Sequence, residues 1–302
     1  MKAALFTEFG GPEVLHLAEV PDPVPGPGEV RVRVHAAGAQ PADTAVRAGR
    51  SMAGLEVTLP AIPGNEFAGV IDRLGPGVED WSLGQQVIGF RFLGGYAEYV
   101  TVDTARLAVK PAAMPWPEAG SLSASGQTAH VALAELRVGP GDTLLVHAAA
   151  GGVGTVAVQL ALARGATVIG TAGERNHAYL RDLGAIPVTY GEGLADRVRA
   201  VAPGGVDAVL DGAGRGALDA SVELVADRSR IGTIIDYPGA ARLGTLALRG
   251  ERTAARLTEL LALWEAGTLR LEIAETFPLA RAADAHRLVE DGHVRGKVVL
   301  LP

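Results

Sequence analysis

Hydrophobic and polar positions alternate in the first 110 residues. Val30, Val32 and Val34 alternate with Arg31 and Arg33, which is typical of a strand with one face in water. Short apolar runs at 69–74 (GVIDRL) and 85–90 (QQVIGF) are bounded by glycine- and proline-rich stretches, as strands between turns are. This pattern predicts an antiparallel, irregular, barrel-like half.

The pattern changes from about Pro117. Residues 118–136 have helical spacing, and apolar strands then alternate with helical stretches up to about Trp264. The strand candidates are Thr143 to His147, Thr167 to Thr171, Ile186 to Tyr190, Ala208 to Leu210, Arg230 to Ile235 and Thr245 to Leu248. Six strands with intervening helices predict an α/β domain with a doubly wound parallel sheet.

The last stretch of the chain has the order strand, helix, strand, and its texture returns to that of the first half. We therefore expect a cofactor domain inserted between two parts of a catalytic domain. The predicted boundaries are 1–118 for the first part of the catalytic domain, 119–265 for the cofactor domain and 266–302 for the return.

Composition narrows the possible functions. The 302 residues carry 27 Lys and Arg against 34 Asp and Glu, with no basic run that would follow a row of phosphates, so nucleic acid is not an expected partner. The absence of cysteine excludes disulfides, thiolate nucleophiles and Cys-ligated zinc. No secretory leader pattern opens the sequence, so a cytoplasmic protein is expected. The most apolar window, 144–162, contains glycines and polar residues that indicate a buried strand and helix rather than a membrane span.

Histidine, serine and aspartate positions give no hydrolytic or metal motif. None of the seven histidines forms an H-x-x-x-H or H-E-x-x-H pair, and the sequence lacks G-x-S-x-G, so no metal is expected and a serine nucleophile has no support. We expect His147 to pack or to bind backbone, and His286 to lie on a C-terminal helix. Asp43 is expected to cap a helix at 41–48, with a ligand-orienting role left open.

The strongest local motif is a glycine-rich turn after the first strand of the predicted sheet. Residues 149–154 read Ala149, Ala150, Gly151, Gly152, Val153, Gly154, a dinucleotide-binding G-x-G-x-x-G with alanine in the first position. A strand precedes the turn and an apolar helix follows. In such a unit Gly151 lets the backbone approach a pyrophosphate, and Gly154 lets the helix pack closely on the sheet. A tightly packed structural turn is the alternative interpretation.

The end of the second strand bears on which dinucleotide binds. NAD enzymes place an Asp or Glu there to bind the ribose 2′-OH, whereas this chain reads TAGERN at 171–176. Arg175 would pair with a 2′-phosphate, which favours NADPH. Glu174 keeps NAD open, because a shift of one residue would make it the ribose acceptor.

Several motifs together resemble one family. They are VHAAAGGVG (146–154), GNEFAGVI (64–71), GGYAEYV (94–100), SGQTAHVAL (125–133), VLDGAG (209–214) and HVRGKVVLL (293–301). They resemble the zinc-free quinone oxidoreductase branch of the medium-chain dehydrogenase/reductase superfamily. The glycine-rich stretch is also similar to enoyl reductase domains of polyketide synthases.

This resemblance implies a GroES-like catalytic domain, a Rossmann domain, an active site between them, NADPH as cofactor, no zinc, and a homodimer. By position it places Gln40 near the nicotinamide ribose, where relatives usually have Asn, and Thr128 at the nicotinamide side. It places Gly173 and Tyr190 at the adenosine 2′-phosphate, and Asp211, Gly212 and Gly214 at the nicotinamide ribose. Gly292 stands where some relatives have a basic residue for that phosphate, so His293 or Arg295 would have to substitute.

The reaction implied is transfer of a hydride from NADPH to a quinone or to the β-carbon of an enone. Enoyl reductases often carry a tyrosine after the stretch that reads RAGRSMAG (47–54) here, and its absence favours quinones. Tyr237 and Tyr96 are candidate proton donors, although packing roles are the plainer interpretation. A non-catalytic NADPH-binding sensor module is the alternative from another class.

Overall fold

The structure is a computed structural model that describes residues 1–50 and 56–302. Residues 51–55, which include the last four residues of the RAGRSMAG stretch, therefore lie outside the described part. The chain forms two compact units. Unit 1 comprises Met1–Ala124, Thr253–Ala262 and Glu272–Pro302, and unit 2 comprises Ser125–Arg252 and Leu263–Leu271. The domain boundaries expected from the sequence stay a prediction.

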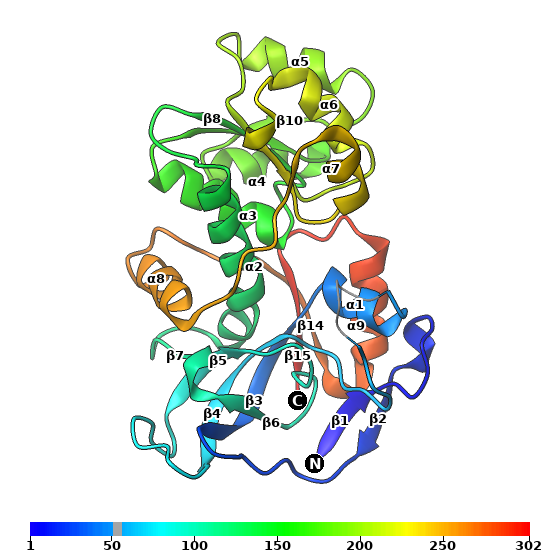
Figure 1. The fold of residues 1–302 in the computed structure, drawn as a ribbon, viewed down its shortest axis with the longest axis vertical. Helices are drawn as coiled ribbons and strands as arrows, with labels where there is room; N and C mark the ends of the chain where they lie inside the picture. The colour runs from blue at the N-terminus through cyan, green and yellow to red at the C-terminus, as the bar shows by residue number, and fades with distance from the viewer. Residues whose placement is uncertain (51–55) are drawn as a thin grey trace. The chain divides into compact units, whose positions relative to one another are not determined.

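Unit 1 is built on a seven-stranded sheet in the order β14-β15-β3-β4-β5-β7, with β6 also paired to β3, and on the separate pair β1-β2 (Figure 1). All pairs are antiparallel except β14-β15. Register shifts in the β3-β4 pair bend the sheet, which confirms the irregular antiparallel half. The strands are β1 (Lys2–Leu5), β2 (His16–Glu19), β3 (Glu29–Ala39), β4 (Glu66–Leu74), β5 (Gln86–Phe90), β6 (Tyr99–Asp103), β7 (Leu107–Val109), β14 (Ile273–Pro278) and β15 (Lys297–Leu301).

The core of unit 1 follows the alternation in the sequence. Val30, Val32 and Val34 are buried, and they cluster with Phe67 and Ile71 of β4. The helices of this unit are α1 (Pro41–Arg47) and α9 (Ala282–Asp291), with short 3-10 turns at η1 (Pro12–Val14), η2 (Thr104–Arg106) and η5 (Leu279–Arg281). The predicted strand, helix and strand of the C-terminal stretch are confirmed as β14, α9 and β15.

Unit 2 contains a six-stranded parallel sheet in the order β10-β9-β8-β11-β12-β13, which confirms the doubly wound sheet. Its strands are β8 (Thr143–His147), β9 (Thr167–Thr171), β10 (Ile186–Val188), β11 (Ala208–Asp211), β12 (Ile231–Thr233) and β13 (Leu246–Ala247). Its helical elements are α3 (Gly152–Ala163), η3 (Glu174–Asn176), α4 (His177–Asp182), α5 (Leu194–Val201), α6 (Ala217–Leu224), η4 (Arg228–Arg230) and α7 (Tyr237–Leu243). Two further helices, α2 (Trp116–Glu135) and α8 (Ala254–Glu265), cross the division between the units.

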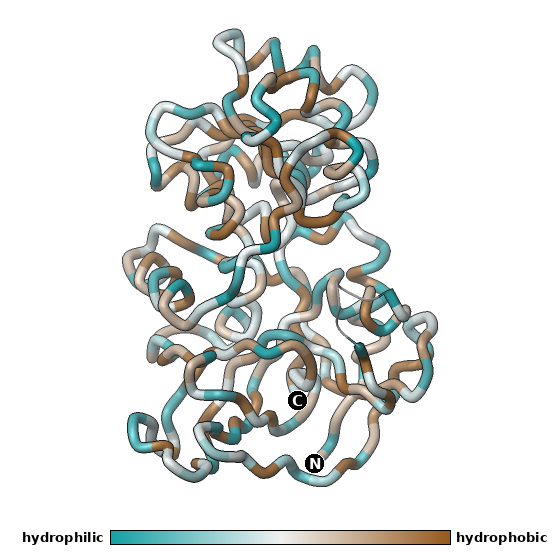
Figure 2. Tube along the Cα trace, viewed as in Figure 1, coloured by the Kyte–Doolittle hydropathy of each residue, from teal (hydrophilic) through white to brown (hydrophobic). Residues whose placement is uncertain are grey.

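The unit 2 sheet lies in the interior of its own unit. Leu145, Ile169, Val209 and Ile231 of its strands are fully buried in one core cluster, and Figure 2 shows hydrophobic stretches along these strands with hydrophilic residues in the connecting loops. Helix α3 contacts β8 and β9, and α6 contacts β11 and β12. Among the described residues, no helix combines the length and the apolar character that crossing a bilayer requires.

Candidate functional site

The glycine-rich turn connects β8 to α3. Ala148 has a left-handed backbone with φ of +56°, and the turn closes through a hydrogen bond from Gly151 N to Ala148 O at 3.0 Å. Ala149 N donates to Thr171 O at 3.0 Å, so the turn is tied to the end of β9. Strand, turn and helix therefore occur where the sequence predicts them.

Gly154 lies in a space that no side chain fits. An added Cβ would stand 2.3 Å from Ala148 O and 2.6 Å from Ala149 Cα, so the first turn of α3 packs directly on the backbone of the preceding turn. At Gly151 the same atom would be 3.3 Å from Ala148 O, which is tight but requires only a small adjustment. The third glycine of the motif thus makes the close approach that its spacing predicts.

The start of α3 is suited to an anion. The first hydrogen bond of the helix runs from Thr155 N to Gly151 O at 2.8 Å. The N–H groups of Gly152, Val153 and Gly154 come before it and have no carbonyl partner within the helix. No side chain in the described residues caps the helix at Gly151. With the positive end of the helix dipole at the same place, this backbone fits the diphosphate of a dinucleotide.

The turn after β9 brings together the residues expected at a 2′-phosphate. Gly173 precedes η3, and a Cβ on it would lie 3.8 Å from Tyr190 Oη. Arg175 and Glu174 are both exposed in the same turn. The structure therefore places Gly173, Tyr190 and Arg175 in one region, and it keeps Glu174 there as well.

Asp211 organises the loop after β11. It is fully buried, its Oδ1 accepts from Ala213 N and Gly214 N at 2.8 Å each, and its Oδ2 accepts from Thr233 Oγ1 at 2.8 Å. Gly214 has φ of +62°, which glycine adopts without strain. The side chain of Asp211 thus shapes this loop by binding the N–H groups of residues 213 and 214.

These loops lie at one edge of the sheet. Strands β8 and β11 are parallel neighbours, with Asp211 opposite His147, and the sheet order reverses between them. Ligands of doubly wound sheets bind at such a switch point, outside the carboxyl ends of the strands. The predicted residues Ala150, Gly152, Gly173 and Gly212 follow the carboxyl ends of β8, β9 and β11.

His147 differs in detail from the prediction. It is buried, with Nε2 3.0 Å from Ser221 Oγ and Nδ1 3.4 Å from Thr171 Oγ1, so its partners are side-chain hydroxyls rather than backbone. Burial lowers the pKa of His147 to about 4, with Asp211 acting in the opposite direction. A neutral imidazole fixed between two hydroxyls ties the end of β8 to the end of β9 and to helix α6.

The other predicted residues of unit 2 are Tyr237 and Thr128. Tyr237 begins α7, its hydroxyl donates to Ile234 O at 3.1 Å, and the Arg249 guanidinium lies 4.2 Å from its ring centroid. Thr128 is half-buried in α2. The Tyr237 hydroxyl is thus engaged by backbone in this structure, and its role as a donor stays a prediction.

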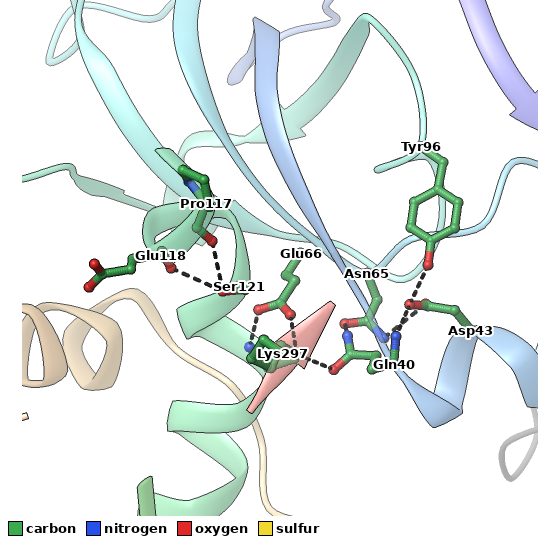
Figure 3. A network of polar contacts seen from close by, with 10 residues as sticks. Gln40, Asp43, Asn65, Glu66, Tyr96, Pro117, Glu118, Ser121 and Lys297 are labelled. Atoms are coloured by element: carbon green, nitrogen blue, oxygen red, sulfur yellow. Dashed lines mark hydrogen bonds and ion pairs between the residues drawn. The ribbon is translucent and has the colours of Figure 1, made fainter. Parts of the chain in front are cut away.

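A second polar centre lies in unit 1, around Asp43 (Figure 3). Asp43 is 3% exposed. Its Oδ2 accepts from Gln40 N at 3.2 Å, as a helix cap does. The same carboxyl group also accepts from Tyr96 Oη at 3.0 Å and from Asn65 Nδ2 at 3.3 Å. Capping was predicted, whereas the role as centre of a buried network was missed.

Glu66 and Lys297 form the other part of this centre. Lys297 Nζ lies 2.9 Å from Glu66 Oε1 and 3.4 Å from Gln40 Oε1, and Glu66 Oε2 accepts from Ala124 N at 2.7 Å. Both charged side chains are buried. Sequence reasoning missed the pair, although a charged residue beside an apolar run, as in GNEFAGVI and GKVVLL, signals a buried partner.

Tyr96 and His286 extend the network away from Gln40. His286 Nε2 lies 3.2 Å from Tyr96 Oη, and Arg47 NH1 lies 3.3 Å from His286 Nδ1. Burial, and also Asp43, raise the pKa of Tyr96 well above its ordinary value, so Tyr96 is a poor proton donor. Burial and Arg47 lower the pKa of His286 to about 3.

The donor sets do not assemble a metal site. No group of three or more His, Asp or Glu side chains in the described residues could hold a metal ion, and the chain has no cysteine.

Comparison with known proteins follows this geometry. Family models match at residues 26–112 (alcohol dehydrogenase GroES-like domain) and 183–300 (zinc-binding dehydrogenase). A quinone oxidoreductase of Pseudomonas aeruginosa is 34% identical over 100% of this chain and 99% of its own length. A 2-haloacrylate reductase of a Burkholderia species is 32% identical over 99% of this chain and 98% of its own length.

Solved structures agree with the sequence relatives. The quinone oxidoreductase of Coxiella burnetii superposes with a TM-score of 0.92 at 34% identity, covering 100% of this chain and 99% of its own. A mycobacterial protein complexed with NADPH has a TM-score of 0.88 at 32% identity, covering 100% of each chain. A GroES-like unit joined to a doubly wound nucleotide-binding unit defines the dehydrogenase/reductase class. The chain belongs to the quinone oxidoreductase branch of the medium-chain dehydrogenase/reductase superfamily.

Proposed function

We propose that this chain is an NADPH-dependent oxidoreductase that transfers a hydride, without zinc, to a quinone or another electron-poor conjugated carbonyl. The observation that carries the proposal is the turn at 148–154, where Gly154 has no room for a Cβ and no side chain of the described residues caps the start of α3 at Gly151. The first N–H groups of the helix would therefore bind an anion. Relatives named as quinone oxidoreductases and a neighbour complexed with NADPH support it.

The chain's own residues would bind and orient the cofactor, which supplies the hydride. Backbone N–H groups of Gly152, Val153 and Gly154 would hold the diphosphate, and Gly173, Tyr190 and Arg175 the 2′-phosphate. The backbone at 212–214, together with Gln40, Thr128 and Tyr237, would border the nicotinamide end. Catalysis would then rest on positioning and on hydrogen bonds to the oxygen that gains charge.

The acceptor is proposed to be a quinone first and an activated C=C bond second. A hydroquinone anion takes its proton from water, whereas an enone needs a proton at carbon. The two tyrosines considered as donors are engaged with Ile234 O and with Asp43, which favours the quinone. The likeness to a 2-haloacrylate reductase supports the alternative.

Turnover separates these possibilities. NADPH oxidation is followed by absorbance with 1,4-benzoquinone, with an enone and with 2-chloroacrylate in parallel. Oxidation with the quinone is expected. Oxidation only with the acrylate or enone would assign C=C reduction, and tight NADPH binding without turnover on any acceptor would assign a binding module.

The phosphate site has its own test. Arg175→Ala is expected to weaken NADPH binding by about tenfold with little change for NADH, because a charge-assisted pair to phosphate is lost. Arg181→Ala, on the exposed surface of α4, is the matched control and should change neither affinity. Equal affinities of the parent protein for NADPH and NADH would overturn the phosphate assignment.

A homodimer and a cytoplasmic location complete the proposal. The proposed homodimer rests on family membership. Light scattering at micromolar concentration tests it, and a monomer at that concentration would overturn the proposal of a dimer. Fractionation of the source cells tests the location.

A further inference from the structure

The polarity of the hydrogen-bond network around Asp43 is fixed from its two ends. One end is the guanidinium of Arg47, 2% exposed, and the other is the ammonium of Lys297, 4% exposed. Both groups donate hydrogen bonds and accept none. Each therefore dictates the direction of every bond that follows it along the network.

The branch from Arg47 has one consistent assignment. Arg47 NH1 donates to His286 Nδ1, so that nitrogen carries no proton and the neutral imidazole carries its proton on Nε2. His286 Nε2 then donates to Tyr96 Oη, and Tyr96 donates to Asp43 Oδ2. The low pKa of His286, about 3, agrees with a neutral ring. Beyond Arg47 the branch ends at Glu290, 30% exposed, 2.5 Å from Arg47 NH2.

The branch from Lys297 fixes two amides whose orientation is otherwise ambiguous. Lys297 donates to Gln40 Oε1, so the amide nitrogen of Gln40 points to Asn65 Oδ1, 2.5 Å away. Asn65 Nδ2 must then donate to Asp43 Oδ1. Reversal of both amides would set Gln40 Nε2 against the Lys297 ammonium, donor against donor.

Both branches end on Asp43. With the backbone N–H of Gln40, its carboxyl group receives three donors, which is the pattern of a carboxylate rather than a protonated acid. Burial raises the pKa of Asp43 to about 7 and Glu66 acts in the same direction, whereas Tyr96, Lys297 and the Gln40 backbone lower it. The three donors thus favour the ionised form while burial favours the neutral one, so Asp43 is a carboxylate above about pH 7. A proton on Oδ1 would require the Asn65 amide, and with it the Gln40 amide, to turn.

We propose that Lys297 and Arg47 polarise this network so that Asp43 is a buried carboxylate and the Gln40 amide has one fixed orientation. In that orientation the Gln40 carbonyl binds Lys297, one N–H binds Asn65, and the second N–H is directed to a ligand. Lys297, Asn65 and Asp43 are then positioning residues. Gln40 would donate to an acceptor oxygen, either a ribose hydroxyl of the cofactor or the carbonyl oxygen of the electron acceptor. The part of the inference that concerns the ligand rests on the proposed function.

Infrared spectroscopy of the cofactor-free protein tests the polarity without any assay of activity. Asp43→Asn identifies the C=O band of protonated Asp43 by removing it. In the parent the band should be absent at about pH 8.5 and grow in as the pH falls through about 7. Gln40→Met removes the lock without changing any charge, and should raise the midpoint by about one pH unit. Ser121→Ala, a buried neutral donor bonded to the Pro117 and Glu118 carbonyls, should leave the midpoint unchanged.

A protonated Asp43 in the parent at about pH 8.5 would overturn the proposal, as would a Gln40→Met titration identical to the parent's. Neither outcome depends on the proposed function.

Kinetics and binding test the ligand part with NADPH and 1,4-benzoquinone. Gln40→Met removes, without a change of charge, the side-chain N–H that the proposal assigns to the ligand. A loss of about tenfold in NADPH affinity would place the Gln40 N–H on the ribose, and a similar loss in kcat at unchanged affinity would place it on the acceptor oxygen. Unchanged binding and turnover would overturn the proposal even where the infrared titration fits. No turnover by the parent would overturn the proposed function, with NADPH affinity still deciding the ribose arm.

Discussion

Gly154→Ala probes the contact on which the proposed cofactor site depends. The new Cβ would lie 2.3 Å from Ala148 O, 2.6 Å from Ala149 Cα and 2.8 Å from Ala149 C. These are backbone atoms, and they are anchored, because Ala148 N donates to Thr171 Oγ1 and Ala149 N donates to Thr171 O. The helix start must therefore move away from the turn.

Two opposing terms set the magnitude. Replacing glycine by alanine inside a helix gains about 1 kcal/mol from helix propensity. Forcing a methyl group into a filled space costs about 1–3 kcal/mol, and more where rigid backbone is struck. The contacts under 3 Å at Gly154 place it at the upper end, so a net loss of about 1–2 kcal/mol in the free energy of unfolding is expected.

Urea unfolding and an NADPH titration provide the assay. Gly151→Ala is the matched control, because its Cβ would meet Ala148 O at 3.3 Å and its φ is −77°, which alanine adopts freely. The control should lose less than about 0.5 kcal/mol of stability. Gly154→Ala should also weaken NADPH binding by about tenfold or more, because it displaces the N–H groups proposed to hold the diphosphate.

Equal stability of Gly154→Ala and the parent would refute the packing explanation. A destabilised variant with unchanged NADPH affinity would refute the link between the packing of this helix start and the diphosphate.

Two further predictions concern buried polar groups of unit 2. In the folded protein His147 has a pKa of about 4, against 6.5 for an unperturbed histidine, so between these pH values the unfolded chain binds a proton there and the folded protein does not. Acidification across that window therefore lowers the free energy of unfolding by up to ~3 kcal/mol. In urea unfolding, His147→Gln should lose correspondingly less stability over the same window. Asp211→Asn places an amide donor against Thr233 Oγ1, so it should lower the free energy of unfolding by about 1–3 kcal/mol and weaken NADPH binding. The control is Asp207→Asn, because the Asp207 carboxylate accepts one exposed backbone N–H. It should cost less than about 1 kcal/mol.

The sequence predicted the sheet of unit 2 well because each strand is a short apolar run closed by turn residues. Strands β8 and β9 have the predicted ends. Strand β12 is shorter than predicted, since Thr233 Oγ1 accepts from Ile235 N and Asp236 N and so turns the chain after residue 233. Strand β10 ends at Val188, two residues before the predicted end at Tyr190, whose side chain is half-exposed.

The network of unit 1 escaped prediction because its members are far apart in the sequence. Asn65 and Tyr96 reach Asp43 from 22 and 53 positions away, and His286 reaches Tyr96 from 190 positions away. No local spacing carries that information. Glu66 and Lys297, two charged residues beside apolar runs, could have signalled buried partners but do not identify them.

Asp211 and Asp43 show why one polar centre could be read from the sequence and the other could not. Two of the donors to Asp211 are backbone N–H groups two and three residues ahead, so the D-G-A-G pattern at 211–214 contains most of its environment. A substitution there is expected to act on that loop. The side-chain donors to Asp43 come from two distant segments, and each is itself an acceptor for another side chain. A substitution at Asp43 must therefore be transmitted along both branches, to the Gln40 amide on one side and to His286 and Arg47 on the other.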